Sequence, residues 1–378
     1  MIIGIDIRVL GNPVKSGVEE YTENLLARML PLDSKIKFKL FYSAYKKKLP
    51  NFDWLHLPNV ELFNFKFPNQ FLFASTRFLN KPKTDQLIGG ADVFFSPHFF
   101  LTSLAKCKRV TTFHDLAFIH FPEFFNWRQN FWHHFEMMPK WQSRFSDKII
   151  AVSESTKNDL VEKYNLDPNK IEVVYSGISP LIKRPREAEL ENFKKEKKLP
   201  ERFLLFLAKL EPRKNVVGII KAFNLLKSNG NFKDLHLIIA GAKGWLCREL
   251  FREYSLSPFR EQIIFTGQAN DRERIFYYSL ASVFVYPSFF EGFGFPPLEA
   301  MACGTPVVAS NRSSLPEVVA DCGLLANPYS IDEIANAIRN LLENESLRDK
   351  MAKRGLKRAG NFSWQKSAEK TLEVLVKA

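Results

Sequence analysis

Short apolar runs alternate with longer helical patterns along all 378 residues, and this alternation restricts the fold more than any other feature. Most runs are continuous in apolar residues, which is typical of strands covered on both faces. The predicted strands are Ile2–Asp6, Phe38–Ser43, Val93–Pro97, Arg109–His114, Lys148–Ser153, Ile171–Ser176, Arg202–Ala208, His236–Gly241, Gln262–Gly267, Ser282–Ser288 and Pro306–Ser310. Strands separated by helices predict an α/β chain with parallel, doubly wound sheets.

The alternation pauses between Gly177 and Pro200, where prolines and charged residues replace the apolar runs. This pause predicts one Rossmann-like domain over residues 1–178, a second over 179–360, and a terminal helix over 361–378. Ligands of open α/β sheets bind beyond the carboxyl ends of the strands. Two such domains facing across a cleft would each contribute loops from those ends.

The N-terminus has neither the basic start nor the long apolar stretch of a signal peptide, and no apolar run is long enough to span a bilayer. The cysteines lie far apart without a Cys-x-x-Cys pair, which is typical of buried thiols in a cytosolic protein. These features predict a soluble, cytoplasmic chain that is either free or attached peripherally to the inner face of the membrane.

The formal net charge is +13, divided as +5 over residues 1–175 and +8 over the rest. Charge distributed in this way is typical of a solvated surface; alternatively, it attracts an anionic lipid surface or a phosphorylated substrate. No nucleic-acid-binding module accompanies the charge, so nucleic acid is not an expected partner.

The strongest motif runs from Glu291 to Pro306, directly after a predicted strand. Its glycines at 292 and 294 let a ligand approach the backbone closely, and prolines open the next helix. A helix start favours a phosphate through its N–H groups and its dipole. We expect Glu291 on the loop and Glu299 in the first helical turn to bind hydroxyls of a sugar and a ribose. Alternatively, Glu299 only stabilises the helix start.

A second motif, residues 208–215, follows the first strand of the second domain. Lys209, Arg213 and Lys214 are predicted to stand at the start of a helix, where cations oppose the dipole. This misfit indicates that they face an anion, and a diphosphate matches their geometry. Alternatively, they are solvated and paired with Glu211.

Two residues of the first domain are weaker candidates. Gly17 lies between a predicted strand and a helix, where turn geometry alone would explain it. His114 ends a predicted strand, which places its imidazole at the carboxyl edge of the sheet, although a lone histidine is more often structural.

Taken together, these motifs resemble the group 1 retaining glycosyltransferases of the large GT4 family, which have the two-Rossmann GT-B fold. The resemblance covers almost the whole chain, and the two-glutamate signature is its most specific part. It is carried by Gly4–Arg8 with Ser16-Gly17, Phe113–Leu116, Ala151–Ser155, Glu211–Asn215 and Glu291–Gly304. The motifs look most like those of bacterial mannosyltransferase-like members that build surface polysaccharides.

The resemblance implies an acceptor-binding first domain, a donor-binding second domain and a terminal helix that crosses back onto the first. Arg213 and Lys214 would neutralise the donor diphosphate, Glu299 would hold the ribose, and Glu291 and His114 would lie at the transferred sugar. Lys209 stands where many members have arginine. The implied catalytic residues are His114 and Glu291, and the implied donor-binding residues are Gly17, Lys209, Arg213, Lys214, Gly292, Phe293, Gly294 and Glu299.

The sequence contains no Asp-x-Asp, the metal-ligand pattern of the metal-dependent glycosyltransferase fold. Fixed cations could stabilise the leaving diphosphate in place of a metal, so no metal or other cofactor is expected. The resemblance implies a hexosyltransferase that retains configuration, with GDP-mannose as donor and a glycan or lipid-linked acceptor. The alternatives are a nucleotide-sugar isomerase or epimerase of the same fold and a non-catalytic nucleotide-sugar-binding protein.

Aromatic and basic residues are mixed between Phe118 and Phe145, and they include a His133-His134 pair that lacks the spacing of a metal site. We interpret this region as a core-packed helix of the first domain. Alternatively, it is a surface that binds a lipid-linked acceptor or the membrane interface.

Overall fold

The computed structural model describes residues 1–11, 17–228 and 230–378. Lys15 and Ser16, part of the motif around Gly17, lie outside the described residues. The chain forms two compact units. Unit 1 comprises Met1–Phe118, Trp127–Gly177 and Ser363–Ala378, and unit 2 comprises Ile119–Asn126 and Ile178–Phe362.

The sheet of unit 1 is parallel and, within the described residues, has seven strands in the order β3-β2-β1-β4-β5-β6-β7. Their bounds are β1 Ile2–Asp6, β2 Lys37–Ser43, β3 Val60–Phe65, β4 Val93–Ser96, β5 Lys108–Phe113, β6 Lys148–Ala151 and β7 Ile171–Val173. Ile3 pairs with Phe38 on one side and Val93 on the other, so the strand order reverses between β1 and β4.

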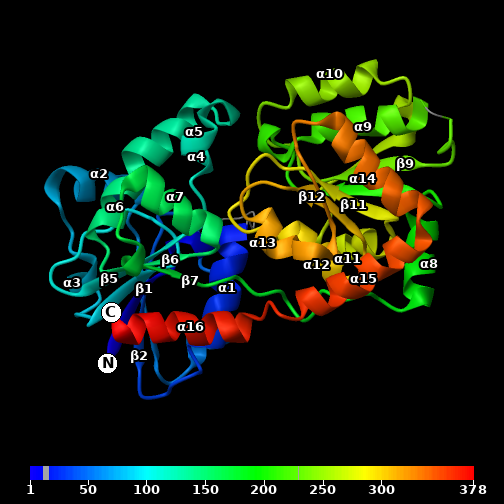
Figure 1. The fold of residues 1–378 in the computed structure, drawn as a ribbon. Coiled ribbons are helices and arrows are strands. Elements are labelled where there is room, and N and C mark those ends of the chain that lie inside the picture. The colour runs from blue at the N-terminus through cyan, green and yellow to red at the C-terminus, as the bar shows by residue number, and fades with distance from the viewer. Residues whose placement is uncertain (12–16, 229) are drawn as a thin grey trace. The chain divides into compact units, whose positions relative to one another are not determined.

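Helices cover both faces of this sheet, and the side chains of its central strands are therefore buried on both sides (Figure 1). The helices are α1 Gly17–Met29, α2 Asn69–Leu79, α3 Thr84–Leu87, α4 Ala117–His120, α5 Trp127–Phe131, the π-helix η4 Trp132–Met137, α6 Pro139–Phe145, α7 Glu154–Tyr164 and α16 Trp364–Lys377. The C-terminal helix α16 packs along α1, and the rings of Tyr21 and Trp364 meet edge to face at 5.7 Å. The last helix of the chain therefore belongs to the unit that contains the N-terminus.

Unit 2 repeats the plan with a parallel sheet of six strands in the described chain, ordered β10-β9-β8-β11-β12-β13. Their bounds are β8 Phe203–Leu207, β9 His236–Ala240, β10 Ile263–Gly267, β11 Val283–Tyr286, β12 Val307–Ser310 and β13 Leu324–Ala326. Its helices are α8 Glu187–Glu196, α9 Val216–Ser228, α10 Arg248–Leu256, α11 Asp271–Leu280, α12 Phe295–Ala302, α13 Leu315–Val319, α14 Ile331–Glu343 and α15 Glu345–Ala359. Here the order reverses between β8 and β11.

The sequence interpretation of residues 118–145 as one core-packed helix is wrong. The region consists of α4, the 3-10 turn η3 Pro122–Phe124, α5, η4 and α6, and residues 119–126 belong to unit 2. The interruptions have local causes: Pro122 opens η3, and Met138 adopts a left-handed conformation (φ 46°) before Pro139. Only part of the region is therefore buried in unit 1.

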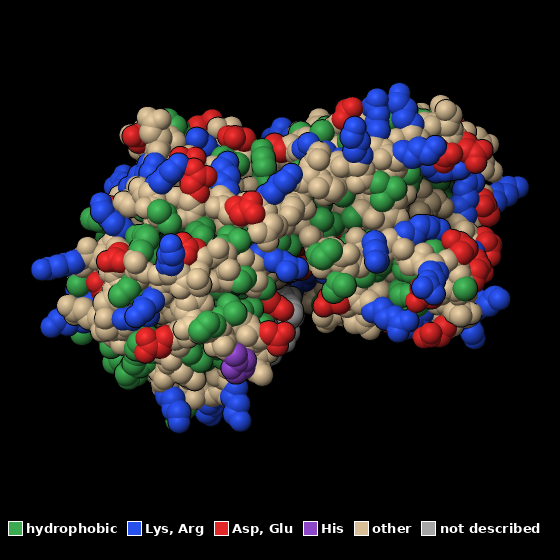
Figure 2. Space-filling view, turned by 90° about the horizontal axis from the view of Figure 1, so that it is seen from below, with side chains coloured by type: hydrophobic (Ala, Val, Ile, Leu, Met, Phe, Trp, Pro, Cys, Tyr) green, Lys and Arg blue, Asp and Glu red, His purple; other side chains and the backbone are tan. Residues whose placement is uncertain are grey.

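On the face seen in Figure 2, Lys and Arg side chains occur over both units and are mixed with Asp and Glu, in agreement with the even spread of charge along the sequence. No helix in the described ranges is long and apolar enough to cross a membrane.

Candidate active site

The site in unit 2 is built where the strand order reverses. Crossovers on the two sides of such a reversal leave the sheet in opposite directions, which opens a crevice at the carboxyl ends of the two strands. The strands here are β8 and β11. Their following loops, residues 208–215 and 287–294, carry both of the strongest sequence motifs.

The loop after β8 folds into the 3-10 turn η6, Pro212–Lys214, and α9 begins only at Val216. Arg213 and Lys214 therefore precede the helix, and the prediction that they stand at its start is wrong in this detail. Asn215 separates η6 from α9, because it adopts a left-handed conformation (φ 55°) that neither helix can continue through.

Asn215 also ties three segments together. Its Nδ2 donates to Pro287 O at 3.2 Å and to Pro328 O at 2.7 Å, and its Oδ1 accepts from Gly218 N at 3.2 Å. A side chain that satisfies three buried backbone groups fixes the loops relative to each other. Asn215 thus holds the loop after β8 against the loop after β11.

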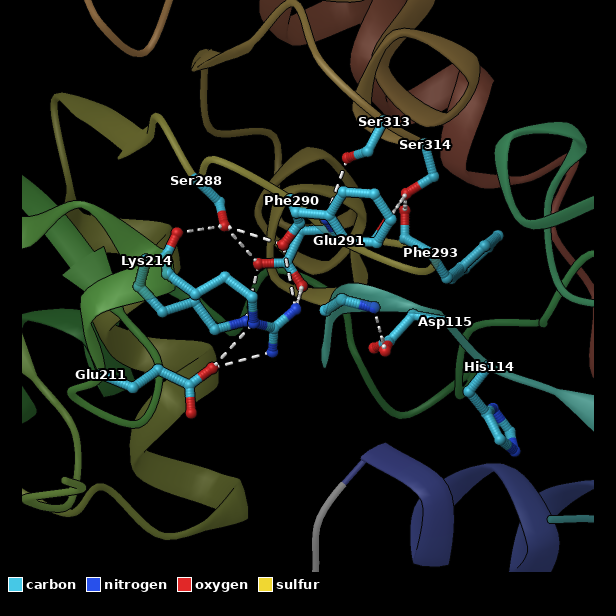
Figure 3. A network of polar contacts seen from close by, with 12 residues as sticks. His114, Asp115, Glu211, Lys214, Ser288, Phe290, Glu291, Phe293, Ser313 and Ser314 are labelled. Carbon is cyan, nitrogen blue, oxygen red and sulfur yellow. Dashed lines mark hydrogen bonds and ion pairs between the residues drawn. The ribbon is translucent and has the colours of Figure 1, made fainter. Parts of the chain in front are cut away.

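Two cations from the first loop meet Glu291 from the second (Figure 3). Lys214 Nζ donates to Glu291 Oε1 at 2.6 Å and to the Tyr286 hydroxyl at 2.8 Å. Arg213 Nη1 donates to Glu291 Oε2 at 3.2 Å and to Phe290 O at 2.9 Å. Arg213 Nη2 donates to Glu211 Oε1 at 2.8 Å. All of these partners lie within unit 2.

Three serines fix the position of Glu291. Ser288 Oγ donates to Glu291 Oε1 at 2.7 Å, and Ser313 Oγ accepts from the Glu291 N–H at 2.9 Å. Ser314 Oγ lies 3.0 Å from Glu291 O and 2.8 Å from Phe293 O, to which it can donate. In Figure 3, Ser288 lies at the carboxylate of Glu291, whereas Ser313 and Ser314 lie at its backbone, so both the side chain and the main chain are held.

The electrostatics of the cluster are balanced. Burial alone would raise the pKa of Glu291, but the charges of Lys214 and Arg213 lower it to about 2, so the carboxylate is ionised at neutral pH. Burial, with a further contribution from Glu291, raises the pKa of Tyr286 well above 10 and keeps its hydroxyl protonated. Together with Glu211, the buried group contains two positive and two negative side chains, and their formal charges cancel.

Glu299 lies in a separate group. It is the fifth residue of α12 rather than part of the first turn, because that helix begins at Phe295. Its Oε2 accepts from the Tyr278 hydroxyl at 2.9 Å, and its Oε1 lies 3.3 Å from Arg274 Nη1. Burial, followed by the charge of Glu299, raises the pKa of Tyr278 well above 10. The carboxylate is therefore already held by α11 on both of its oxygens.

The start of α12 is shaped by its glycine and prolines. Gly294 has φ +109°, and a Cβ there would lie 2.7 Å from Leu315 Cδ2, so only glycine fits without strain. Pro296 and Pro297 occupy early helical positions and carry no N–H, which leaves fewer backbone donors for an anion than an ordinary helix start would offer. Gly292 and Phe293 lie in the loop before this turn.

Lys209, the remaining predicted donor-binding cation, is exposed. Its Nζ lies 4.9 Å from the centre of the Trp245 ring, as in a cation–π contact. Trp245 in turn donates from Nε1 to Phe124 O at 2.7 Å. The contacts of Lys209 therefore differ from those of Arg213 and Lys214, although all three belong to one motif.

Two predicted residues lie in unit 1. His114 directly follows β5, its Nε2 lies 2.8 Å from Pro97 O, and the Tyr21 ring meets it edge to face at 4.7 Å. Burial lowers the pKa of His114 below its ordinary 6.5, so the ring is neutral at pH 7. Gly17 is the first residue of α1.

In the part of the chain that the structure describes, no three His, Cys, Asp or Glu side chains gather closely enough to hold a metal ion. Within the two motifs of unit 2, the cations that could contact an anionic ligand are Lys209, Arg213 and Lys214, and the carboxylates that could accept from ligand hydroxyls are Glu211, Glu291 and Glu299.

Solved structures share this architecture. Sucrose-phosphate synthase from Thermosynechococcus elongatus superposes with a TM-score of 0.76 at 19% identity, covering 100% of this chain and 98% of that one. HepE from Anabaena, in complex with UDP and glucose, superposes with a TM-score of 0.74 at 19% identity and covers both chains fully. The two parallel-sheet units thus define the GT-B fold of glycosyltransferases.

Sequence relatives specify the family. Residues 15–180 match the Glycosyltransferase Family 4 model, and residues 187–358 match the model of glycosyl transferases group 1. The O-antigen chain mannosyltransferase B of Escherichia coli is 32% identical over 293 residues, which are 74% of this chain and 73% of the relative. The serotype-specific mannosyltransferase WbdA of Escherichia coli is 31% identical over 234 residues, which are 60% of this chain but only 28% of WbdA. The chain belongs to the group 1, family 4 glycosyltransferases and is a glycosyltransferase enzyme.

Proposed function

We propose that the protein transfers mannose from GDP-mannose to a glycan or lipid-linked acceptor, with retention of configuration and without a bound metal ion. Mannose is supported by the names of the relatives, which include the O-antigen chain mannosyltransferase of Escherichia coli. Retention is carried over from the family resemblance. The observation that carries the chemistry is the pairing of Lys214 and Arg213 with Glu291 at the strand reversal of unit 2.

The pairing suggests an exchange of partners when the donor binds. The diphosphate would draw Lys214 and Arg213 away from Glu291, and the released carboxylate would accept from a hydroxyl of the sugar. When the bond between C1 and the diphosphate oxygen breaks, that oxygen keeps the electrons, and fixed cations stabilise the charge. The acceptor oxygen bonds to C1, and its proton passes to the leaving diphosphate.

The direct test uses purified protein, EDTA and p-nitrophenyl α-mannoside as acceptor, with GDP-mannose and UDP-glucose compared as donors. We expect transfer from GDP-mannose that EDTA leaves unchanged, with an α-linked product by NMR. Transfer from UDP-glucose alone would refute the choice of donor, and loss of activity in EDTA would refute metal independence. Conversion of the donor to another nucleotide sugar without acceptor would indicate an isomerase or epimerase, whereas binding without turnover would indicate a non-catalytic binding protein.

We also propose that unit 1 contacts an anionic membrane surface through an aromatic surface. This surface consists of large exposed side chains on α2, α5 and η4: Phe71, Phe78, Leu79, Trp127, Phe131 and Phe135. Arg77 connects the two parts, because it donates to Phe135 O and its guanidinium lies 5.6 Å and 5.4 Å from the Phe78 and Phe135 rings. Exposed aromatic rings next to cations are typical of interfacial segments.

Co-sedimentation with phosphatidylcholine vesicles, with and without phosphatidylglycerol, tests this contact. We expect binding only to the anionic vesicles and its loss in a Phe78→Ser/Phe131→Ser variant. The control is Leu256→Ser, which removes a similarly exposed side chain from unit 2. Equal vesicle binding by all variants would refute the proposal. A wild-type dimer in sedimentation velocity that the double variant abolishes would also refute it, because a second copy of the chain would then cover the aromatic surface.

A further inference from the structure

Unit 1 has its own reversal of strand order, between β1 and β4. The general rule for open parallel sheets places a ligand crevice at the carboxyl ends of these two strands. The residues that leave the end of β4 are Ser96, Pro97 and His98. His114, the histidine singled out by the sequence, lies one strand further along, after β5.

Two polar groups at the end of β4 have no hydrogen-bond partner among the described residues. They are Ser96 Oγ and His98 Nδ1, and both atoms are buried. Buried polar atoms are nearly always paired in folded proteins, so two orphans within three residues need an explanation. A ligand whose hydroxyls reach this end of the sheet would supply one.

The His98 ring lies among aromatic neighbours. Its centroid lies 4.3 Å from Phe99, 5.0 Å from Phe100 and 5.6 Å from His114, and it stacks on Trp132 at 6.4 Å. Burial, followed by the charges of His114 and His133, lowers the pKa of His98 well below 6.5. The ring is therefore neutral and has one donor nitrogen and one acceptor nitrogen.

The proton positions follow from the partners. Pro97 O can only accept, so His114 Nε2 carries its proton and His114 Nδ1 is an acceptor. His98 Nδ1 is buried without a partner, and an unpaired acceptor is tolerated better than an unpaired N–H. His98 Nε2 therefore carries the proton. His98 Nδ1 is therefore an acceptor without a partner among the described residues, which suits a sugar hydroxyl because a hydroxyl can donate to it.

We infer that His98 binds a hydroxyl of the acceptor sugar, beside His114, at the strand reversal of unit 1. This inference rests on the proposed glycosyl transfer. The acceptor is favoured over the donor sugar because Trp132, which stacks on His98, begins η4, the segment that carries exposed Phe135 of the aromatic surface. An acceptor that arrives along this surface would reach Trp132 and His98 first.

The test compares His98→Phe, which keeps a ring but removes both nitrogens, with His98→Gln, whose amide oxygen restores an acceptor. The matched control is His56→Phe at an exposed histidine of unit 1 that is hydrogen-bonded to Asn51. The readouts are KM for p-nitrophenyl α-mannoside, KM for GDP-mannose, and the rate of GDP-mannose hydrolysis without acceptor. Thermal unfolding shows that each variant is folded.

We expect His98→Phe to raise the acceptor KM about tenfold, the effect of one lost hydrogen bond, and His98→Gln to recover part of this loss. KM for GDP-mannose and the hydrolysis rate should stay within about twofold of wild type, because the donor contacts remain. An unchanged acceptor KM would overturn the inference, and so would a change confined to the donor KM or the hydrolysis rate.

The outcome can be separated from that of the proposed function. If the wild type uses a different donor, the same acceptor comparison is made with that donor and still decides the role of His98. If the wild type transfers nothing, calorimetric titration of the mannoside in the presence of GDP decides it. Weaker binding to His98→Phe than to wild type would support the inference, and equal binding or no binding to either would refute it.

Discussion

The Lys214 ammonium lies 2.6 Å from Glu291 Oε1, although the two residues belong to loops that are 77 positions apart in the sequence. Both side chains are buried, so each charge depends on the other for compensation. The contact therefore joins the stability of unit 2 to the diphosphate binding that we propose for Lys214.

Replacing Lys214 with methionine tests the ligand-binding side of this contact. Lys214→Met keeps most of the side-chain volume but removes the charge, so we expect GDP to bind about 10- to 100-fold more weakly, as for the loss of a charged hydrogen bond. Isothermal titration of GDP measures this change. Lys221→Met, at an exposed lysine of α9, should bind GDP like wild type. If Lys214→Met also did so, the diphosphate would not contact this residue.

Replacing Glu291 with glutamine tests the stability side. The pKa of Glu291 is lowered to about 2 from an ordinary 4.5, so its stabilisation is present above pH 4.5 and is lost as the pH falls toward 2. The shift corresponds to about 3 kcal/mol in the free energy of unfolding. We expect wild type to exceed Glu291→Gln by roughly this amount at neutral pH in urea denaturation, with the gap shrinking on acidification. The exposed Glu261→Gln should show no gap, and a constant gap for Glu291→Gln would contradict the assignment.

Glu299 has two candidate roles, which are binding the donor ribose and stabilising the packing of α12 against α11. Its two oxygens are occupied by Tyr278 and Arg274, yet a ribose hydroxyl could still share one of them. We expect wild type to bind GDP more tightly than 2′,3′-dideoxy-GDP, and Glu299→Gln to lose this preference. Tyr278→Phe should lower stability by about 1 kcal/mol and keep the preference. A preference that survives in Glu299→Gln would assign Glu299 to the helix alone.

Asn215 should be important for stability. Asn215→Gly removes its three hydrogen bonds, and we expect a loss of about 2 kcal/mol in unfolding free energy. Asn215→Ala should lose about 1 kcal/mol more, because alanine is also strained at positive φ. Asn165 at the end of α7 has the same φ of 55° and is exposed, so Asn165→Gly should leave stability nearly unchanged. Equal losses at both sites would contradict the proposed role of the Asn215 side chain.

Much of the fold could be predicted from the sequence, because strands buried on both faces leave continuous apolar runs. Each predicted strand overlaps an observed one, and Ile2–Asp6 matches β1 at both ends. The strands β3 and β13 were not predicted. Both lie at sheet edges, where β3 is half exposed with polar residues between its apolar ones and β13 has only three residues. An edge strand owes its existence to its neighbour more than to its own pattern.

The site was predicted less completely. The motifs predicted Arg213, Lys214 and Glu291 as candidates, since local misfits such as clustered cations are visible in the sequence; the structure brings the three together, and their role in donor binding stays a prediction. Their pairing was not predictable, because it depends on loops that the strand order brings together. The supporting hydroxyls of Ser288 and Tyr278 gave no signal for the same reason. His98 had a visible cue in its place after a predicted strand, the same cue that drew attention to His114.

The balanced charge of the buried group in unit 2 has a consequence for selectivity. Inorganic phosphate or another stray anion would have to break two internal ion pairs and could offer nothing to the carboxylate it displaced. A nucleotide sugar brings hydroxyls together with its phosphates, so it can satisfy both sides of the broken pairs. Because its charges are balanced internally, the proposed site would bind the abundant inorganic anions of a cell weakly and nucleotide sugars more tightly.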